Sequence, residues 1–231
     1  MIPLIDVVGD WDKFLDTILV TDEIVNNLNY INQQYRKHEN NLVYPEIYPA
    51  QENVFKAFQE CSYHKMSVIV LLQDPYPDGR ATGLAAANPN DGKLSPSLQV
   101  IKDTILHKVY NGDESAMQFD PTLIKWAKQG VLMLNTALTV EKNKSLSHSQ
   151  LWTLFTTKFL QKMNEVNSGI VYCLWGQYAK SYKAFINANS NTILECTHPV
   201  YAAYRNKNWD CNHFTEINNY LKKFNNTYII W

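Results

Sequence analysis

The stretch that decides the fold is Val68-Ile69-Val70-Leu71-Leu72-Gln73-Asp74-Pro75-Tyr76, in which five apolar residues are followed at once by polar ones. A short run without any polar residue is typical of a strand that is covered on both faces of a parallel sheet. The pattern recurs at residues 131–134, at residues 170–174 and, more weakly, at residues 192–196. Because helical segments separate these runs, we expect an α/β fold of one domain, with a central four-stranded, mainly parallel sheet and helices on both faces.

The helices around these strands are predicted from apolar spacing and from capping signals. Helical spacing predicts helices at residues 11–19, 24–35 and 51–60. Asp120 and Pro121 are typical of a helix start, and Gly130 is typical of a helix end. Ser147 and Gln150 have the spacing of a capping box, which predicts a further helix start there.

Composition limits the class of protein. The chain has 231 residues, of which 45% are hydrophobic and 19% charged, and this balance indicates a folded protein of ordinary size. The four cysteines are far apart and form no C-x-x-C pair, so neither a zinc site nor a disulfide framework is predicted. Without a basic start or a run of 18 apolar residues, we expect no signal peptide and no membrane span. The expected location is therefore a reducing intracellular compartment, cytoplasmic or nuclear, and not a secreted one.

The net charge of -1 hides an uneven distribution along the chain. Residues 1–60 hold 4 basic and 10 acidic side chains, whereas residues 121–231 hold 12 basic and 5 acidic ones. The second half could therefore present a positive face to a polyanion such as a nucleic acid. A surplus of this size is more often a solvated surface, so charge alone does not decide the question.

Polar residues follow every predicted strand at the same end. They are Gln73-Asp74 after the first run, Asn135 after the second, Gly176-Gln177 after the third and His198 after the fourth. The carboxyl ends of parallel strands meet at one edge of the sheet, where ligands bind, so we expect these groups to converge on one site. Any one of them alone is more often a cap of a loop or helix, and it is their combination that favours a site.

These residues, taken with their neighbours, resemble the family I uracil-DNA glycosylases. The resemblance rests on Gln73-Asp74-Pro75-Tyr76, on the block from Trp126 to Val140, on Leu174-Trp175-Gly176 and on His198-Pro199 with Tyr204-Arg205. It spans roughly residues 44–231 in the order of the family. It implies a catalytic domain over residues 44–231 and an N-terminal helical extension, residues 1–43, packed on it.

The resemblance implies hydrolysis of the bond between uracil and deoxyribose in DNA by base flipping, which leaves an abasic site. No metal or organic cofactor is expected. Asp74 is the expected catalytic carboxylate, which orients water and stabilises the cationic sugar, and His198 is the expected donor to uracil O2. The chemistry requires both, because positive charge develops on the sugar and negative charge on the leaving base.

The remaining site residues are also carried over from the family. Asn135 is expected to read uracil N3–H and O4, Tyr76 to exclude the thymine methyl group, and Gln73 and Ala86 to line the uracil site. The expected contacts with DNA come from Ser97, Gly176, Gln177, Tyr201 and Arg205, with Tyr201 as the candidate wedge in the duplex. For Ser97 the alternative is that this region only starts a helix, with Ser95 as its cap.

The chain departs from the family pattern in ways that leave alternatives open. Ala86 stands where the family has a phenylalanine that stacks on uracil, Pro77 stands where it commonly has a histidine, and the loop from Asp74 to Gly83 is one residue shorter. The alternatives are a non-catalytic DNA-binding or replication scaffold on the same fold, and a glycosylase with an altered base preference. Expected partners are uracil-containing DNA, single- or double-stranded, and conceivably a protein inhibitor that mimics DNA; we expect a monomer.

Overall fold

The sheet is at the centre of the molecule, and the computed structural model describes residues 9–231 around it. Its four strands are all parallel and lie in the order β3-β2-β5-β6. They are β2 (Val68–Leu72), β3 (Val131–Asn135), β5 (Val171–Trp175) and β6 (Thr192–Cys196). The predicted α/β fold with a parallel sheet is thus confirmed. The residues of β2, β3 and β5 are buried throughout, which explains why the sequence of these strands does not alternate.

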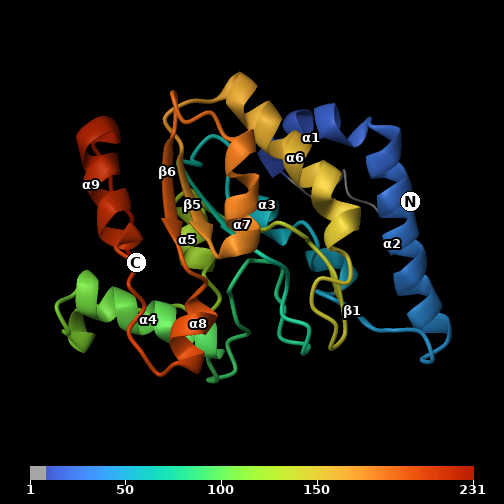
Figure 1. Cartoon of the computed structure of the whole chain (residues 1–231), viewed down its shortest axis with the longest axis horizontal. Coiled ribbons are helices and arrows are strands. Elements are labelled where there is room, and N and C mark those ends of the chain that lie inside the picture. Colours follow the sequence, from blue (N-terminus) through green and yellow to red (C-terminus); the bar gives the residue numbers. More distant parts are fainter. Residues whose placement is uncertain (1–8) are drawn as a thin grey trace.

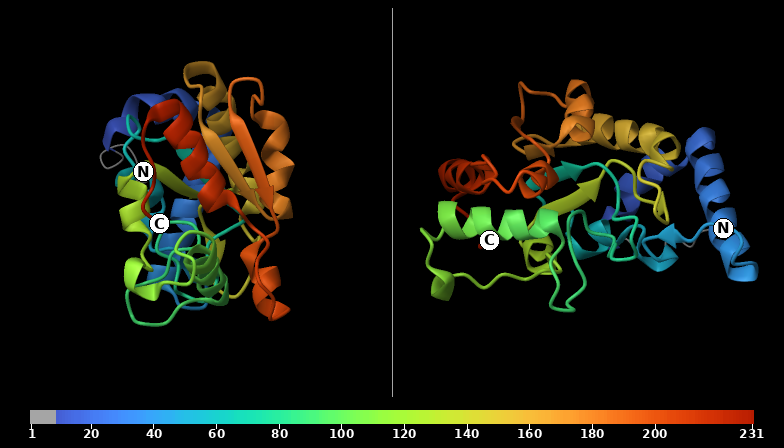
Figure 2. Two further views of the ribbon diagram at one scale, coloured as in Figure 1. Left: turned by 90° about the vertical axis from the view of Figure 1, so that its left-hand side faces the viewer. Right: turned by 60° about the horizontal axis from the view of Figure 1, so that its bottom comes forward.

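Helices cover both faces of this sheet. Figure 2 (left) shows α7 on one side of the strands and α9 on the other. The helices are α1 (Asp12–Leu19), α2 (Asp22–Asn40), α3 (Lys56–Glu60), α4 (Pro96–Lys108), α5 (Ile124–Lys128), α6 (Ser149–Val166), α7 (Gln177–Ser181), α8 (Pro199–Tyr204) and α9 (His213–Asn225). A separate two-stranded antiparallel ribbon joins β1 (Ile47–Tyr48) to β4 (Val140–Glu141).

The first two helices pack on the rest of the chain and do not stand apart from it. Trp11 is fully buried in the hydrophobic core, and its indole N–H donates a hydrogen bond of 2.6 Å to the carbonyl of Cys61. Helices α1 and α2 both lie against α6 (Figure 1). The expected extension over residues 1–43 is therefore part of one continuous core from residue 9 onward, and residues 1–8 lie outside the described residues.

Two predicted helix starts are wrong. The helix expected at Asp120 begins only at Ile124, because Leu123 has a left-handed backbone with a φ of 55°. Asp120 instead caps a turn, in which its carboxylate accepts from the N–H of Thr122 at 3.0 Å. Gly130 follows the end of α5 as predicted, and its φ of 94° is one that glycine adopts readily.

The predicted capping box is also absent. Helix α6 begins at Ser149 after His148, without a side-chain cap, and the hydroxyl of Ser147 accepts from the N–H of Glu141 at 2.8 Å. The helix expected over residues 51–60 is divided into a 3-10 turn at Gln51–Asn53 and the short α3. No helix within the described part of the chain is both long and apolar enough to cross a membrane.

Candidate active site

A pocket opens at the carboxyl edge of the sheet, and it brings together residues that follow three of its strands. Asp74 lies two residues after β2, Asn135 ends β3, and His198 lies two residues after β6. All three line the pocket, together with Tyr76 and Ala86. Of the side chains expected to converge, those of Asp74, Asn135 and His198 line the pocket, and those of Gln73 and Gln177 do not.

The fourth strand contributes backbone to the same place. Gly176 follows β5 and has a φ of 98°, and a Cβ atom built on it would lie 2.9 Å from the Cβ of His198. Only glycine leaves room for the imidazole this close to the end of β5. The close contact fixes His198 against the sheet edge.

The carboxylate of Asp74 is held by a loop that sequence reasoning missed. One oxygen, Oδ2, accepts from the hydroxyl of Ser145 at 2.8 Å and from the backbone N–H of Leu146 at 2.6 Å. The other, Oδ1, accepts from the amide of Gln73 at 2.9 Å, and that amide also donates to Ser145 at 3.1 Å. The amide of Gln73 therefore orients Asp74, and the loop fixes the direction of the carboxylate.

This loop is itself anchored to the core. His148 lies at its end, just before α6, and its Nδ1 is 2.8 Å from the hydroxyl of Thr139. That hydroxyl also accepts from the indole N–H of Trp152 at 2.7 Å, and its own proton is free to point to a neutral His148. Burial lowers the pKa of His148, although the nearby carboxylate of Glu141 acts in the opposite direction. A neutral His148 can accept this bond and so keeps the loop in place.

His198 caps a helix with one of its ring nitrogens and can donate from the other. It is the N-cap residue of α8, and its Nδ1 accepts from the backbone N–H of Val200 at 3.2 Å. Because Nδ1 accepts, the proton of the neutral ring is on Nε2. Burial lowers the pKa of His198 below its ordinary value, while the negative charge of Asp74 partly offsets this effect. The ring is therefore neutral near pH 7 and has an N–H to donate.

Asn135 has an unsatisfied acceptor. Its side chain is only 7% exposed, and its Oδ1 is buried without a hydrogen-bond partner among residues 9–231. A buried amide oxygen without a partner costs free energy, and such groups are rare in folded proteins. The structure thus has an acceptor that a ligand in the pocket could satisfy.

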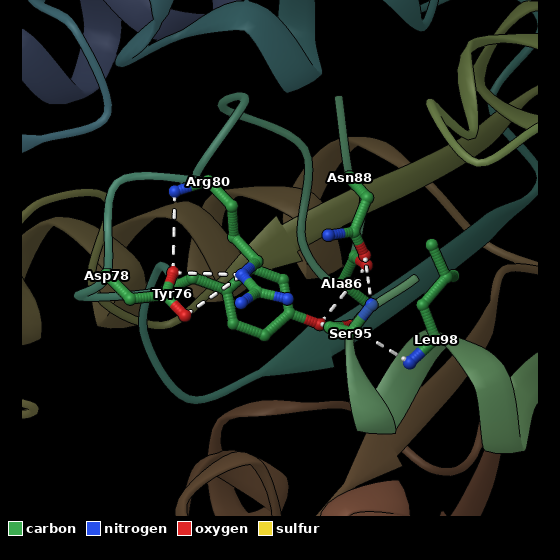
Figure 3. Close-up of polar contacts among 7 residues, drawn as sticks. All are labelled: Tyr76, Asp78, Arg80, Ala86, Asn88, Ser95 and Leu98. Carbon is green, nitrogen blue, oxygen red and sulfur yellow. Dashed lines mark hydrogen bonds and ion pairs between the residues drawn. The ribbon is translucent and has the colours of Figure 1, made fainter. Parts of the chain in front are cut away.

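Tyr76 is held rigidly on the pocket wall (Figure 3). Its hydroxyl is 2.8 Å from the hydroxyl of Ser95 and 3.3 Å from the carbonyl of Ala86, to which it donates. Ser95 is in turn fixed, because its hydroxyl accepts from the N–H of Leu98 at 3.1 Å and its N–H donates to Asn88 at 3.1 Å. Burial raises the pKa of Tyr76, so the phenol stays protonated and can donate.

Ala86 lines the pocket with a very small side chain. It is 6% exposed and has a left-handed backbone with a φ of 62°. Among the described residues that line the pocket, the aromatic side chains are those of Tyr76 and His198. The position where the resembled family has a stacking ring is therefore left without one.

The residues expected to contact DNA lie in different environments. Tyr201 on α8 is 57% exposed, and Arg205 and Gln177 are also exposed. Ser97 is 3% exposed within the first turn of α4, so its hydroxyl does not face solvent. Ser95 is the N-cap of that helix, as the alternative interpretation of this region predicts.

The parallel sheet is covered by helices on both faces, and the pocket at its carboxyl edge is lined by a carboxylate, an amide and an imidazole. This combination of fold and pocket is typical of an α/β enzyme or ligand-binding protein. The sequence model of the uracil DNA glycosylase superfamily matches residues 58–222. The chain belongs to this superfamily. It is 35% identical over 198 residues to a uracil-DNA glycosylase of Aliarcobacter butzleri, covering 85% of this chain and 89% of the relative.

Other relatives and solved structures agree with this family. A uracil-DNA glycosylase of Campylobacter jejuni is 36% identical over 225 residues, which cover 96% of this chain and 92% of the relative. This match extends into the N-terminal helices. Among solved structures, a variant of mimivirus UNG in complex with UGI has a TM-score of 0.83 at 22% identity, covering 96% of this chain and 88% of that one. A UNG of Nitratifractor salsuginis has a TM-score of 0.55 at 19% identity, covering 84% of each chain, and both structures support the fold.

Proposed function

We propose that this chain excises uracil from DNA by hydrolysing the bond between the base and its deoxyribose. The observation that carries the proposal is the pocket in which a carboxylate, a neutral imidazole and an unpartnered buried amide oxygen meet. Family membership supports the same reaction. A base within a duplex must first leave the stack to enter such a pocket, at a cost of a few kcal/mol.

Asp74 acts on the sugar side of the bond. As the bond breaks, positive charge develops on the deoxyribose, and a carboxylate held beside it stabilises that charge. The three hydrogen bonds from Gln73, Ser145 and Leu146 fix the carboxylate before the substrate arrives. Such preorganisation avoids reorientation during the reaction. Asp74 also orients the attacking water.

His198 acts on the base side. The departing uracil carries negative charge, and the Nε2–H of His198 donates to its O2. A neutral donor suits this task, because it gives a hydrogen bond to an anion without losing its proton. The lowered pKa of His198 and the bond from Val200 to Nδ1 keep the ring in this form.

Asn135 and Tyr76 select uracil. Oδ1 of Asn135 accepts from uracil N3–H, and its amide group donates to O4. Cytosine reverses both groups, and sites built on such pairs reject the wrong partner by a factor on the order of 10⁴. Tyr76 excludes thymine because its hydroxyl is bonded to Ser95 and Ala86, so the ring cannot yield to a C5 methyl group.

The DNA backbone meets the exposed residues around the pocket. Gln177, the first residue of α7, offers its backbone N–H group to a phosphate. The N–H of Gly176 already donates to the carbonyl of Cys196 at 2.9 Å, so Gly176 contributes only the close approach of a backbone without a side chain. Arg205 offers charge, and Tyr201 is the proposed wedge. For Ser97, whose hydroxyl is buried, the group that the first turn of α4 can offer is the backbone N–H of Ser97 itself, because Pro96 has no N–H and that of Leu98 donates to Ser95. The chain works as a monomer, and an anionic protein inhibitor that mimics DNA would compete for the same face.

The experiment that tests the proposal replaces Asp74 with asparagine, which is nearly isosteric. Release of uracil from a labelled oligonucleotide should slow by at least a hundredfold, while binding of uracil-containing DNA should change little. Asp91→Asn, which removes an exposed carboxylate outside the pocket, is the matched control and should release uracil at the wild-type rate. Wild-type rates in the Asp74 variant would refute the role given to this carboxylate, and an inactive wild-type protein that still binds DNA would favour the scaffold.

A further inference from the structure

The segment that carries His198 has a cysteine at each end. Cys196 is the last residue of β6, and Cys211 lies two residues before α9. Residues 197–210, between the two cysteines, include His198, Tyr201 and Arg205. Anything that joins the two thiols therefore closes the base of this segment, which we call the histidine loop.

The two thiols lie together in a buried cluster. The sulfur atoms of Cys196 and Cys211 and one ring nitrogen of His213 all lie within 4.8 Å of one another. Cys196 is 7% exposed and Cys211 is 2% exposed. Three such ligand atoms are what a soft metal ion requires, so the cluster has two chemical interpretations, a metal site or a dithiol.

The hydrogen bonds of His213 argue against the metal. The indole N–H of Trp175 donates to its Nδ1 at 2.9 Å, and an indole nitrogen can only donate. The proton of the ring is therefore on Nε2, and the ring donates to the backbone carbonyl of Glu195. A metal on Nε2 would move the proton to Nδ1, where it would face the N–H of Trp175. A metal on Nδ1 would displace that indole.

The two cysteines are left as a pair. We propose that Cys196 and Cys211 are a modification site, at which peroxide converts the two thiols into a disulfide across the base of the histidine loop. Cys173, also buried, lies on the adjacent strand β5, where Cys173 pairs in register with Leu194 and Trp175 with Cys196. It is not part of the cluster that joins the ends of the loop.

The chemical step is a two-electron oxidation. The thiolate of Cys196 attacks one oxygen of hydrogen peroxide, the O–O bond breaks, and the hydroxide released takes up a proton to leave as water. The resulting sulfenic acid is attacked by the sulfur of Cys211, which forms the S–S bond and releases a second water. Two thiols and one peroxide thus give one disulfide and two waters.

The surroundings favour Cys196 over Cys211 as the thiol that reacts first with peroxide. A hydrogen bond from Cys211 lowers the pKa of Cys196 against the opposing effect of burial, and the charge of Lys180 acts in the same direction as that bond. Burial raises the pKa of Cys211, so this thiol keeps its proton and donates it. The thiol of Cys196 also donates to the backbone carbonyl of Asp210 at 3.1 Å, so it must release this bond before it reacts as a thiolate.

The cross-link would act on the active site through His198. In a disulfide the sulfur atoms are about 2.0 Å apart, so the side chains at both ends of the histidine loop must turn toward each other and are then fixed. His198 is packed against Gly176 and has no room to move toward the sheet. We therefore expect the oxidised protein to release uracil several-fold more slowly, and this effect on rate rests on the proposed function.

The experiment treats the reduced full chain with hydrogen peroxide, blocks the free thiols and measures the intact mass and the peptide map. We expect the loss of two hydrogens, a fall from four free thiols to two, and one peptide that links Cys196 to Cys211. Cys173→Ser is the matched control and should still form the link, whereas Cys196→Ser and Cys211→Ser should not. Dithiothreitol should restore both the mass and the rate.

Three results would overturn the proposal. They are four free thiols after treatment, a link that involves a different cysteine, and a stoichiometric zinc ion that the wild-type chain binds and His213→Gln does not. The wild-type mass decides the question even if a serine variant fails to fold. Since mass is measured independently of uracil release, a protein that forms the cross-link but releases no uracil even when fully reduced would count against the proposed function alone.

Discussion

Ser145 donates a hydrogen bond of 2.8 Å to the carboxylate of Asp74 from 71 residues away in the sequence. The same hydroxyl accepts from Gln73, so three side chains form one connected unit at the edge of the pocket. The bond fixes the carboxylate in the direction that the developing positive charge of the sugar requires. Ser145 is thus a positioning residue for the proposed reaction, because it acts through Asp74.

Ser145→Ala should lower kcat about tenfold, because a hydrogen bond to a charged group is worth roughly 1.5–3 kcal/mol. KM should change little, since the hydroxyl holds the carboxylate and not the DNA. Ser145→Thr retains the hydroxyl and should recover most of the rate. Ser115→Ala is the control, because it removes a similar bond, to Asp113, at an exposed site. A rise in KM at constant kcat would assign Ser145 to DNA binding instead.

Asn135→Leu should separate activity from stability. The Oδ1 of Asn135 has no partner in the described protein, so an apolar residue of similar volume should leave the free energy of unfolding unchanged or raise it by up to about 1 kcal/mol. Uracil release should fall by at least tenfold, because the group that reads the base is gone. Urea unfolding and single-turnover kinetics measure the two effects.

The contrast is Asn164→Leu. The side chain of Asn164 donates to the carbonyl of Phe185 at 2.6 Å and accepts from the N–H of Asn187 at 3.0 Å. Its loss leaves those two partners unpaired and should destabilise the protein by about 1–3 kcal/mol. If Asn135→Leu proved equally destabilising, Asn135 would be a structural residue and not a reader of the base.

Stability should decrease as the pH falls, and His213 should account for part of the decrease. Burial lowers the pKa of His213 to about 4. The backbone bond to Glu195 acts in the opposite direction, and the charge of Lys180 lowers the pKa further. The unfolded chain takes up a proton on His213 near pH 6.5, but the folded chain does so only near pH 4. The contribution of the neutral ring to the free energy of unfolding is therefore complete above pH 6.5 and is lost as the pH falls from 6.5 to 4. The shift corresponds to about 3 kcal/mol.

Urea unfolding at several pH values measures this effect. In His213→Gln the dependence of the free energy of unfolding on pH should be weaker between pH 6.5 and 4, although His198 and His148, whose pKa values are also lowered, still contribute in the same direction. An identical slope in His213→Gln and the wild type would show that His213 is not buried as a neutral ring.

The strands were predictable because a strand that is buried on both faces consists of a short run of apolar residues. The run from Val68 to Leu72 holds only apolar residues, and its short length and its β-branched residues favour a strand covered on both faces over a buried helix. The helix starts were harder to predict. The left-handed backbone of Leu123 and the use of the Ser147 hydroxyl by Glu141 are features of the loops before these helices, which no capping signal contains.

The candidate site was predictable only where strands end. Asp74, Asn135 and His198 follow strands, so the topology of the sheet alone brings them together. Ser145 lies in a polar loop between β4 and α6, and no spacing in the sequence links it to Asp74. The burial of Ser97 could not be inferred either, because a serine in a first helical turn is as often exposed as covered.

Ala86→Phe tests whether the small residue in the pocket limits uracil excision or widens the choice of base. A ring added at this position would stack on the uracil, and base stacking on an aromatic ring is worth about 1–3 kcal/mol. The left-handed backbone at residue 86 is already occupied by an L-residue, so the substitution adds little backbone strain. The affinity for free uracil and kcat/KM for uracil-containing DNA should therefore rise about tenfold.

The same ring should close the space that Ala86 leaves over the base. Release of a uracil derivative that is bulkier on this face should fall in Ala86→Phe, and the ratio of the two rates measures the preference directly. If the wild type releases such a derivative faster than uracil, the altered base preference is the correct interpretation of this position. A loss of uracil release in Ala86→Phe, with no change in its affinity for DNA, would instead mean that the base occupies the volume the ring requires, so that the alanine is part of the fit of the pocket to its base.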